Sequence, residues 1–509
     1  MRRPRLIYYS DAHHFHGKRL DPPLNMHKMR WPVDELLGTG VEMLTFGLGF
    51  GDVFFHQTKI GRIIGQDQET WKSFINWRIM RMVKDAHSMG TDQLQEVIRR
   101  SRQMRLPVFP SLKLQDPAAP GDERCGRLKM TKGKEVTLGV SDSRFPDYKT
   151  EWCYDYANEQ VRNEKLALLR EVLEDYQAEG IDLDFMFFPL YFKEADTEKN
   201  IPIMNQFVAE VKRMASEVEG RQGREVPVMA RVWSRKEENL RFGLDPESWL
   251  RSKSVDMVVA QPAGQMMDTG IREAAWLAES ANAAGAAAYF RTPRKVSDVR
   301  TNIANIEMYR AASQTLFAQG FTGMFLGYLP WPFAEGEYSL LREMAFPEAT
   351  GRRDKRYFIA STEKMPSYSA PDGRQLPTDL KEGQTTTLNV VVSDDVENAR
   401  REGEMRDPTL TVAFRFYCVE DEVEFKLNGA VLPAASTELL EPHRGSYWLR
   451  WKLDAALVKR GDNKLEITDR KMAKLAAFTR TVTGVELHLR YKDFQRPEGL
   501  EVNRLAPPS

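Results

Sequence analysis

Hydrophobic positions follow two successive patterns along the chain. Up to about residue 345, short apolar runs alternate with long amphipathic stretches, which is typical of βα units around a parallel sheet. Eight such runs favour a closed (β/α)₈ TIM barrel over an open doubly wound sheet. The predicted strands are Leu6–Tyr9, Val41–Phe46, Leu106–Ser111, Ile181–Met186, Val226–Val232, Val255–Ala260, Ala286–Phe290 and Gly323–Gly327.

The stretches between these runs predict helices. Asn158 is a good N-cap residue, and Leu166, Leu169 and Leu173 follow it at three- and four-residue spacing. Residues 115–149 are polar and rich in Pro and Gly, and they follow the third strand. We therefore expect an insertion on the C-terminal face of the barrel, where long loops commonly shape a binding site.

The pattern changes after residue 345. A stretch rich in Pro, Ser and charge comes first, and apolar residues then alternate at period two, as at Leu410, Val412 and Phe414. Short alternating strands separated by turn residues predict an antiparallel β-sandwich. The predicted domains are a barrel over 1–345, a linker over 346–380, a β-sandwich over 381–495 and a tail over 496–509.

Composition adds exclusions to this picture. Lys and Arg together number 73, as do Asp and Glu, so we expect neither a nucleic-acid partner nor an anionic membrane. No apolar run reaches membrane-spanning length, and the basic start leads directly into a strand without a signal-peptide pattern. A cytoplasmic protein is expected, or an exported one shown without its leader. The three cysteines form no C-x-x-C pair, which excludes a disulfide framework.

The segment Gly180-Ile181-Asp182-Leu183-Asp184-Phe185 carries the strongest chemical signal. Asp182 and Asp184 are two apart on one strand, so both side chains point to the same side, the barrel interior. Barrel active sites lie at the C-terminal ends of strands, and two close carboxylates push their pKa values apart into an acid and a base. A second interpretation stays open, in which Asp182 pairs with a neighbouring Arg or Lys and only Asp184 takes part in chemistry.

Two family resemblances rest on this segment. The motif resembles the Asp-x-Asp-x-Glu signature of glycoside hydrolase family 18, the chitinases, whose final Glu is the general acid; here Met186 stands at that position. The wider segment, from Asp155 through Pro189, resembles the glycoside hydrolase-like proteins of family 10, and departs from them at Phe187, where they carry Arg. This resemblance covers roughly residues 5–335. It implies a barrel with its site at this strand, and it is less specific for the reaction.

Histidines gather after the first strand. Five of the eight lie within the first 56 residues, and Asp11-Ala12-His13-His14-Phe15-His16 follows the strand directly. Three histidines and a carboxylate are a ligand set for a divalent ion, but adjacent His13 and His14 point apart in an extended chain. We expect sugar binding or a structural role for them, with no metal or other cofactor, and keep a divalent ion as the alternative.

Other strand ends supply the remaining candidates. Asp116 has a loop cap as its alternative role, and Trp331 is an aromatic surface on which a sugar can stack. Asp184 and Asp182 are the predicted catalytic residues. The predicted substrate-binding residues are Asp11, His13, His14, Lys113, Asp116, Arg231, Trp233, Gln261, Tyr289, Arg291 and Trp331.

Three functional hypotheses follow, each with a carbohydrate as partner. The first is a glycoside hydrolase on a poly- or oligosaccharide, with Asp184 as nucleophile or general base. The second is a lyase or metal-assisted enzyme in which Lys113, Arg231 and Arg291 hold a uronate or sulfate, while a His or Tyr takes the proton. The third is a non-catalytic carbohydrate-binding barrel, because no Glu stands at Met186 or directly after the fifth and seventh strands.

Overall fold

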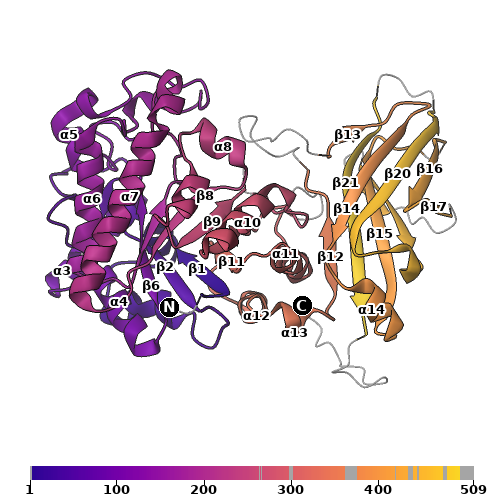
Figure 1. Ribbon diagram of the computed structural model, residues 1–509, viewed down its shortest axis with the longest axis horizontal. Coiled ribbons are helices and arrows are strands. Elements are labelled where there is room, and N and C mark those ends of the chain that lie inside the picture. Colours follow the sequence, from indigo (N-terminus) through magenta and orange to yellow (C-terminus); the bar gives the residue numbers. More distant parts are fainter. Residues whose placement is uncertain are drawn as a thin grey trace.

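The computed structural model describes residues 3–262, 264, 266–296, 302–361, 375–418, 420–433, 440–443, 446–473 and 478–492. It has two parts side by side, an N-terminal barrel and a C-terminal pair of sheets, with α11 and β12 between them (Figure 1). Among the described residues, no helix combines the length and the apolar character needed to cross a bilayer.

Eight parallel strands close into a barrel in the order β1, β2, β6, β7, β8, β9, β10, β11. The predicted (β/α)₈ fold is therefore confirmed, and each predicted strand overlaps an observed one. The barrel strands are β1 Leu6–Ser10, β2 Met43–Gly47, β6 Val108–Lys113, β7 Ile181–Asp184, β8 Val228–Trp233, β9 Met257–Gln261, β10 Ala287–Arg291 and β11 Gly323–Gly327.

Helices cover the outside of the barrel, and several begin at a side-chain cap, as when Asn158 accepts from the Gln160 amide to start α6. Their apolar faces join the outward-facing strand residues in one large buried core. The helices of this part are α1 Ala12–Arg19, α2 Met26–Asp34, α3 Phe74–Ser88, α4 Gln93–Met104, α5 Arg127–Lys132, α6 Glu159–Glu174, α7 Thr197–Gln222, α8 Lys236–Arg241, α9 Pro246–Arg251, α10 Ala275–Ala284, α11 Ile306–Ala318, α12 Glu335–Glu343 and α13 Pro347–Thr350.

The interior of the barrel divides into an apolar part and a charged part. Ile7, Met43, Phe109, Met229 and Phe325 belong to one buried cluster inside the strands. Two or four residues further along three of these strands, the inward positions are charged, at Asp11, Lys113 and Arg231. The charges therefore gather at the mouth of the barrel, on the face where sites of this fold are built.

Two antiparallel sheets form the C-terminal part and enclose a second core. One sheet runs β12–β21–β15–β19–β18 with β13 beside β21, and the other runs β14–β20–β16–β17, which confirms the predicted sandwich. The strands are β12 Lys355–Phe358, β13 Thr378–Asp379, β14 Thr385–Val392, β15 Met405–Arg415, β16 Glu422–Leu427, β17 Ala430–Val431, β18 Leu440–His443, β19 Ser446–Lys452, β20 Gly461–Lys471 and β21 Thr481–Tyr491, with helix α14 Val396–Arg401.

The stretch predicted as a linker contains part of this sandwich. β12 lies within residues 346–380 and pairs with β21, so the sheet begins before residue 381. The predicted tail 496–509 lies outside the described residues. On the barrel side, Ala311 of α11 is buried in the sandwich core, and the Thr315 hydroxyl lies 2.9 Å from that of Ser393. The two parts thus share a packed contact.

Candidate functional site

Three charged side chains stand in a row across neighbouring strands at the barrel mouth. Lys113 on β6 is in register with Asp184 on β7, and Asp184 is in register with Arg231 on β8. One oxygen of Asp184 accepts from the Met186 amide at 2.9 Å, and the other lies 3.3 Å from Arg231 Nη1. The hydrogen bond from the Met186 amide turns the backbone where β7 ends at Asp184, and it holds the Asp184 carboxylate in one orientation.

Asp182 lies below Asp184 and has no exposure to solvent. Its Oδ2 accepts from Arg231 Nε at 2.9 Å, and Arg231 also donates to the Ser111 hydroxyl. Burial raises the pKa of Asp182, and the Arg231 guanidinium opposes this rise. The structure therefore pairs Asp182 with an arginine inside the barrel, the arrangement that the second interpretation of the motif described.

Asp11, directly after β1, accepts hydrogen bonds from several residues of the mouth. Its Oδ2 accepts from Lys113 Nζ at 3.0 Å, from the Tyr328 hydroxyl at 2.9 Å and from the Tyr9 hydroxyl at 3.2 Å. Its Oδ1 accepts from the His13 amide and so caps α1. Burial alone would raise the pKa of Asp11, but Lys113 and His14 hold it well below its usual value. Asp11 therefore stays ionised and fixes Lys113 in place.

The two adjacent histidines have different surroundings. The His13 ring stacks on Phe50 at 3.6 Å between centroids, and burial lowers the pKa of His13 to about 4, so it is neutral at physiological pH. The His14 side chain is 41% exposed, and its Nδ1 lies 3.6 Å from Asp11 Oδ2. With Nδ1 toward the carboxylate, Nε2 is on the opposite edge of the ring. His14 is therefore the more accessible of the two for proton transfer.

Arg291 ends β10, two residues beyond inward-facing Tyr289, and is partly buried. Its guanidinium lies 5.4 Å from the centre of the Tyr328 ring. Gln261 ends the neighbouring strand, and because Ala260 pairs with Phe290, Gln261 and Arg291 follow side by side. Trp233 ends β8 and packs on Phe242 at 5.8 Å. In the strand order β10 lies opposite β6, so Arg291 stands across the mouth from Lys113, with Trp233 on β8 and Gln261 on β9 along one side between them.

Two predicted substrate-binding residues lie away from the mouth. Tyr289 has no solvent exposure and belongs to the apolar cluster within the barrel. Asp116 is also sealed from solvent: its Oδ1 caps the Ala118 amide, and Gly51 packs so closely that a Cβ there would lie 1.9 Å from Asp116 Oδ2. Burial raises the pKa of Asp116 to about 6. This is the loop-cap geometry that the sequence left open for Asp116.

The insertion after β6 is fixed by a buried ion cluster. Asp52 accepts from Lys129 at 2.9 Å and from Lys165 at 3.1 Å, and all three side chains are almost fully buried. Lys129 of α5 also donates to the Asp116 carbonyl at 2.6 Å. Asp52 lies in the turn of a small sheet that follows β2, composed of β3 Gly49–Phe50, β4 Val53–Phe54 and β5 Arg62–Ile63. These contacts set where the insertion lies on the barrel.

Trp331 lies on the rim after β11, with a 38% exposed surface. Its ring is 5.9 Å from that of Trp31 on α2, and the Arg19 guanidinium lies 5.8 Å from its centre. Trp331 therefore offers an exposed aromatic surface beside a cation, separate from the charged row within the barrel.

Some residues of the mouth were absent from the predicted site. Tyr328 has a positive φ of 58° and aims its hydroxyl at Asp11, and Phe187 covers Lys113 with its ring centre 4.4 Å from Nζ. Phe50 lies between His13 and Arg124. The sequence signal for the aromatic residues Tyr328 and Phe187 is their place directly after strands; Phe50, on the two-residue strand β3, and Arg124, in a longer loop, carry no such signal.

Of the five early histidines, His13 and His14 have rings in contact at 5.6 Å between centroids, and the other three make separate contacts. His16 bonds the Ala12 carbonyl, His27 lies at Trp31, and His56 is at 3.8 Å from Glu171. Within the described part of the chain, three possible metal ligands approach one another elsewhere, at the contact between barrel and sandwich: Glu307, Asp354 and His488.

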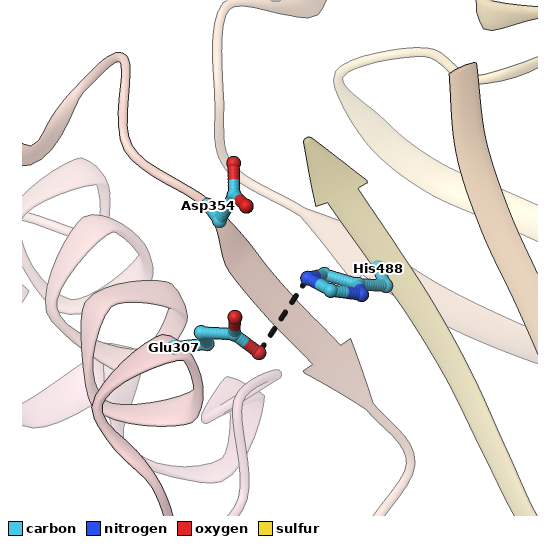
Figure 2. A group of neighbouring side chains, drawn as sticks. All are labelled: Glu307, Asp354 and His488. Atoms are coloured by element: carbon cyan, nitrogen blue, oxygen red, sulfur yellow. Dashed lines mark ion pairs between the residues drawn. The ribbon is translucent and has the colours of Figure 1, made fainter. Parts of the chain in front are cut away.

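Figure 2 shows this trio, with the His488 ring facing Glu307 across 3.5 Å. Arg356 of β12 already lies 3.2 Å from the same Glu307 oxygen and also pairs with Glu486. A cation is therefore present at Glu307 without a metal ion. The arrangement is an ion network that spans α11, β12 and β21, and it links the two parts of the molecule.

No family model matches the chain, and no curated protein matches its sequence. Among solved structures, an endo-β-1,4-mannanase from Thermotoga petrophila is similar at 13% identity, over 96% of this chain and 98% of that chain, with a TM-score of 0.48.

Two further solved structures are similar over different shares of the chain. An α-amylase from Geobacillus thermoleovorans has 9% identity, covers 92% and 99% of the two chains, and has a TM-score of 0.41. An α-L-fucosidase from Paenibacillus thiaminolyticus has 12% identity, covers 69% of this chain and 50% of that chain, and has a TM-score of 0.42.

Proposed function

We propose that this protein is a glycoside hydrolase that acts on a poly- or oligosaccharide at the mouth of its barrel. The observation that carries the proposal is the placing of Asp184. Its carboxylate stands at the C-terminal end of β7, between Lys113 and Arg231, and is oriented by the Met186 amide. Asp184 is the nucleophile or the general base in this proposal.

Asp182 has a supporting role. Its carboxylate binds Arg231 from below, and Arg231 in turn contacts Asp184 at 3.3 Å. Fixing a catalytic group through a buried, fully engaged neighbour reduces the reorganisation needed during reaction. Asp182 acts through Arg231 and does not reach the substrate itself.

Hydrolysis also needs a group that protonates the leaving oxygen. Met186 stands where chitinases of family 18 carry that acid, so the proton comes from another group in this proposal. His14 suits the role because its side chain is exposed and its Nδ1 faces Asp11 at 3.6 Å. A histidine oriented by a carboxylate on one nitrogen presents the other for proton exchange.

The experiment is a screen on a broad panel of neutral and acidic glycans, in water enriched in heavy oxygen. A hydrolase is expected to release products with one added water and the heavy isotope at the new reducing end. A lyase would release an unsaturated, ultraviolet-absorbing product without the isotope. Either that product or binding without any cleavage across the panel would overturn the proposal.

A further inference from the structure

The basic residues at the barrel mouth differ in how they are neutralised. Lys113 pairs with Asp11 at 3.0 Å, and Arg231 is shared by Asp182 and Asp184. Arg124, which lies over the Phe50 ring, pairs with Asp116 at 3.4 Å. Each of these cations has a carboxylate in contact, so none offers an uncommitted charge to a ligand.

Arg291 is the exception. Among the residues that the structure describes, no carboxylate lies within ion-pair distance of its guanidinium, whose contact is the Tyr328 ring at 5.4 Å. Burial disfavours its charge, and this lowers the pKa of Arg291 although the group stays protonated at any physiological pH. A partly buried arginine without a counter-ion costs free energy, and an anionic ligand would recover it.

The position of Arg291 connects this charge to the proposed chemistry. It points into the mouth from β10, with Gln261 beside it on β9, and β10 lies across the barrel from β6, whose Lys113 is in register with Asp184. The Tyr328 ring on which it packs is fixed by the hydrogen bond from the Tyr328 hydroxyl to Asp11. An anion bound by Arg291 would therefore belong to the sugar next to Asp184, or to its immediate neighbour.

We propose that Arg291 binds an anionic group on the substrate, and that the substrate is therefore an acidic glycan. A guanidinium forms two parallel hydrogen bonds with a planar carboxylate, and it also binds sulfate oxygens, so a uronic acid and a sulfate ester share the required chemistry. The proposal rests on the proposed function, because it assumes that a glycan occupies the mouth, but it is tested separately from bond cleavage.

The test compares Arg291→Gln and Arg291→Lys with the native protein on matched substrates. Uronate-containing glycans are each presented beside their carboxyl-reduced form and beside a sulfated neutral form. Native protein is expected to favour an acidic form. Arg291→Gln is expected to lower the ratio of kcat/KM on the acidic form to kcat/KM on the reduced form by about tenfold or more. A tenfold change corresponds to about 1.4 kcal/mol, the scale of one hydrogen bond to a charged group. Arg291→Lys should recover part of that ratio, because lysine keeps the positive charge but cannot form the two parallel hydrogen bonds of a guanidinium.

Arg221→Gln is the matched control, because Arg221 is 57% exposed and loses the same charge in the last turn of α7, which leads to the opposite end of the barrel. The melting temperature of each variant checks that it folds. If the carboxylate form alone shows the effect, the ligand group is a uronate; if the sulfated form alone does, it is a sulfate. An unchanged ratio in a folded Arg291→Gln, or preference of the native protein for reduced forms, would overturn the proposal.

The same set of glycans is measured for binding to Asp184→Asn, with and without Arg291→Gln. If no glycan is cleaved but acidic forms bind and lose binding on Arg291→Gln, the acidic ligand stands and the hydrolase proposal fails. If glycans are cleaved without preference for an acidic group, the hydrolase proposal stands and the assignment of Arg291 fails. If no acidic glycan binds, the assignment of Arg291 fails as well.

Discussion

Arg231 is the counter-ion of two carboxylates at the mouth of the barrel, those of Asp182 and Asp184. Its guanidinium contacts Asp182 and Asp184 and lies 4.2 Å from the centre of the Tyr9 ring, with only 3% of the residue exposed. Removing one member of a buried ion pair leaves an uncompensated charge, which costs more than the pair itself contributes. Loss of the Arg231 guanidinium would leave the carboxylates of Asp182 and Asp184 buried without this counter-ion.

We therefore expect Arg231→Met to lower the free energy of unfolding by about 3–5 kcal/mol, because both aspartates lose their counter-ion. Asp182→Asn should cost less, because Arg231 keeps its contact with Asp184. Urea unfolding of both variants at pH 7 measures the difference. Equal losses, or a negligible loss in Arg231→Met, would mean that the pairing does not stabilise the barrel.

The residues of the mouth could be predicted where strand parity placed them. Asp11, Lys113, Asp184, Arg231 and Arg291 follow or end apolar strands at inward positions, and the alternation of side chains is a property of any strand. The alternation of side chains along a strand does not show how deep in the barrel an inward-facing residue lies. Tyr289, two residues before Arg291, is predicted at the mouth but lies in the apolar interior. Nor does the alternation show that Gly51 seals Asp116.

At the scale of elements, buried parallel strands were the most predictable feature. All eight appear as apolar runs because both of their faces are covered, and the last, Gly323–Gly327, has the predicted bounds. The two-residue strands β3, β4 and β5 left no such run. β12 lies in the stretch that the sequence predicts as a linker, because Lys355 and Arg356 interrupt its apolar pattern and because its partner β21 lies far along the chain.

The contact of α11 with β12 and β21 has a pH-dependent component. Hydrogen bonding to His488 and the nearby Arg356 lower the pKa of Glu307 from 4.5 to about 2. A carboxyl whose pKa is depressed on folding stabilises the native state above its unfolded pKa. That stabilisation is lost as the pH falls from about 4.5 toward 2.

Glu307→Gln should therefore lower the free energy of unfolding at pH 7, by about 1 kcal/mol because the side chain is partly exposed. The difference from the native protein should shrink as the pH falls through 4 toward 3. Urea unfolding at several pH values measures it, with exposed Glu279→Gln on α10 as control. A difference that is constant with pH would show that the charge of Glu307 does not contribute.

At the scale of the whole molecule, the sandwich is attached to the side of the barrel that bears α11. Thr269, after β9, exchanges hydrogen bonds with the backbone of Phe358 at 2.9 Å in both directions, so the connection extends beyond the ion network. The sandwich contacts α11, the helix between β10 and β11 along the chain, and these are the strands that bear Arg291 and lead to Tyr328. The sandwich thus packs on the outer layer of the barrel next to these strands.

The central claim is that Asp184 performs the chemistry, and turnover by Asp184→Asn tests it most directly. On any glycan that the native protein cleaves, the account predicts that kcat falls by at least about 10³-fold, the scale seen when a catalytic side chain is removed, with an unchanged fold. Asp175→Asn, at the exposed end of α6, makes the same substitution outside the site and should leave turnover intact. Undiminished turnover by a folded Asp184→Asn would contradict the account.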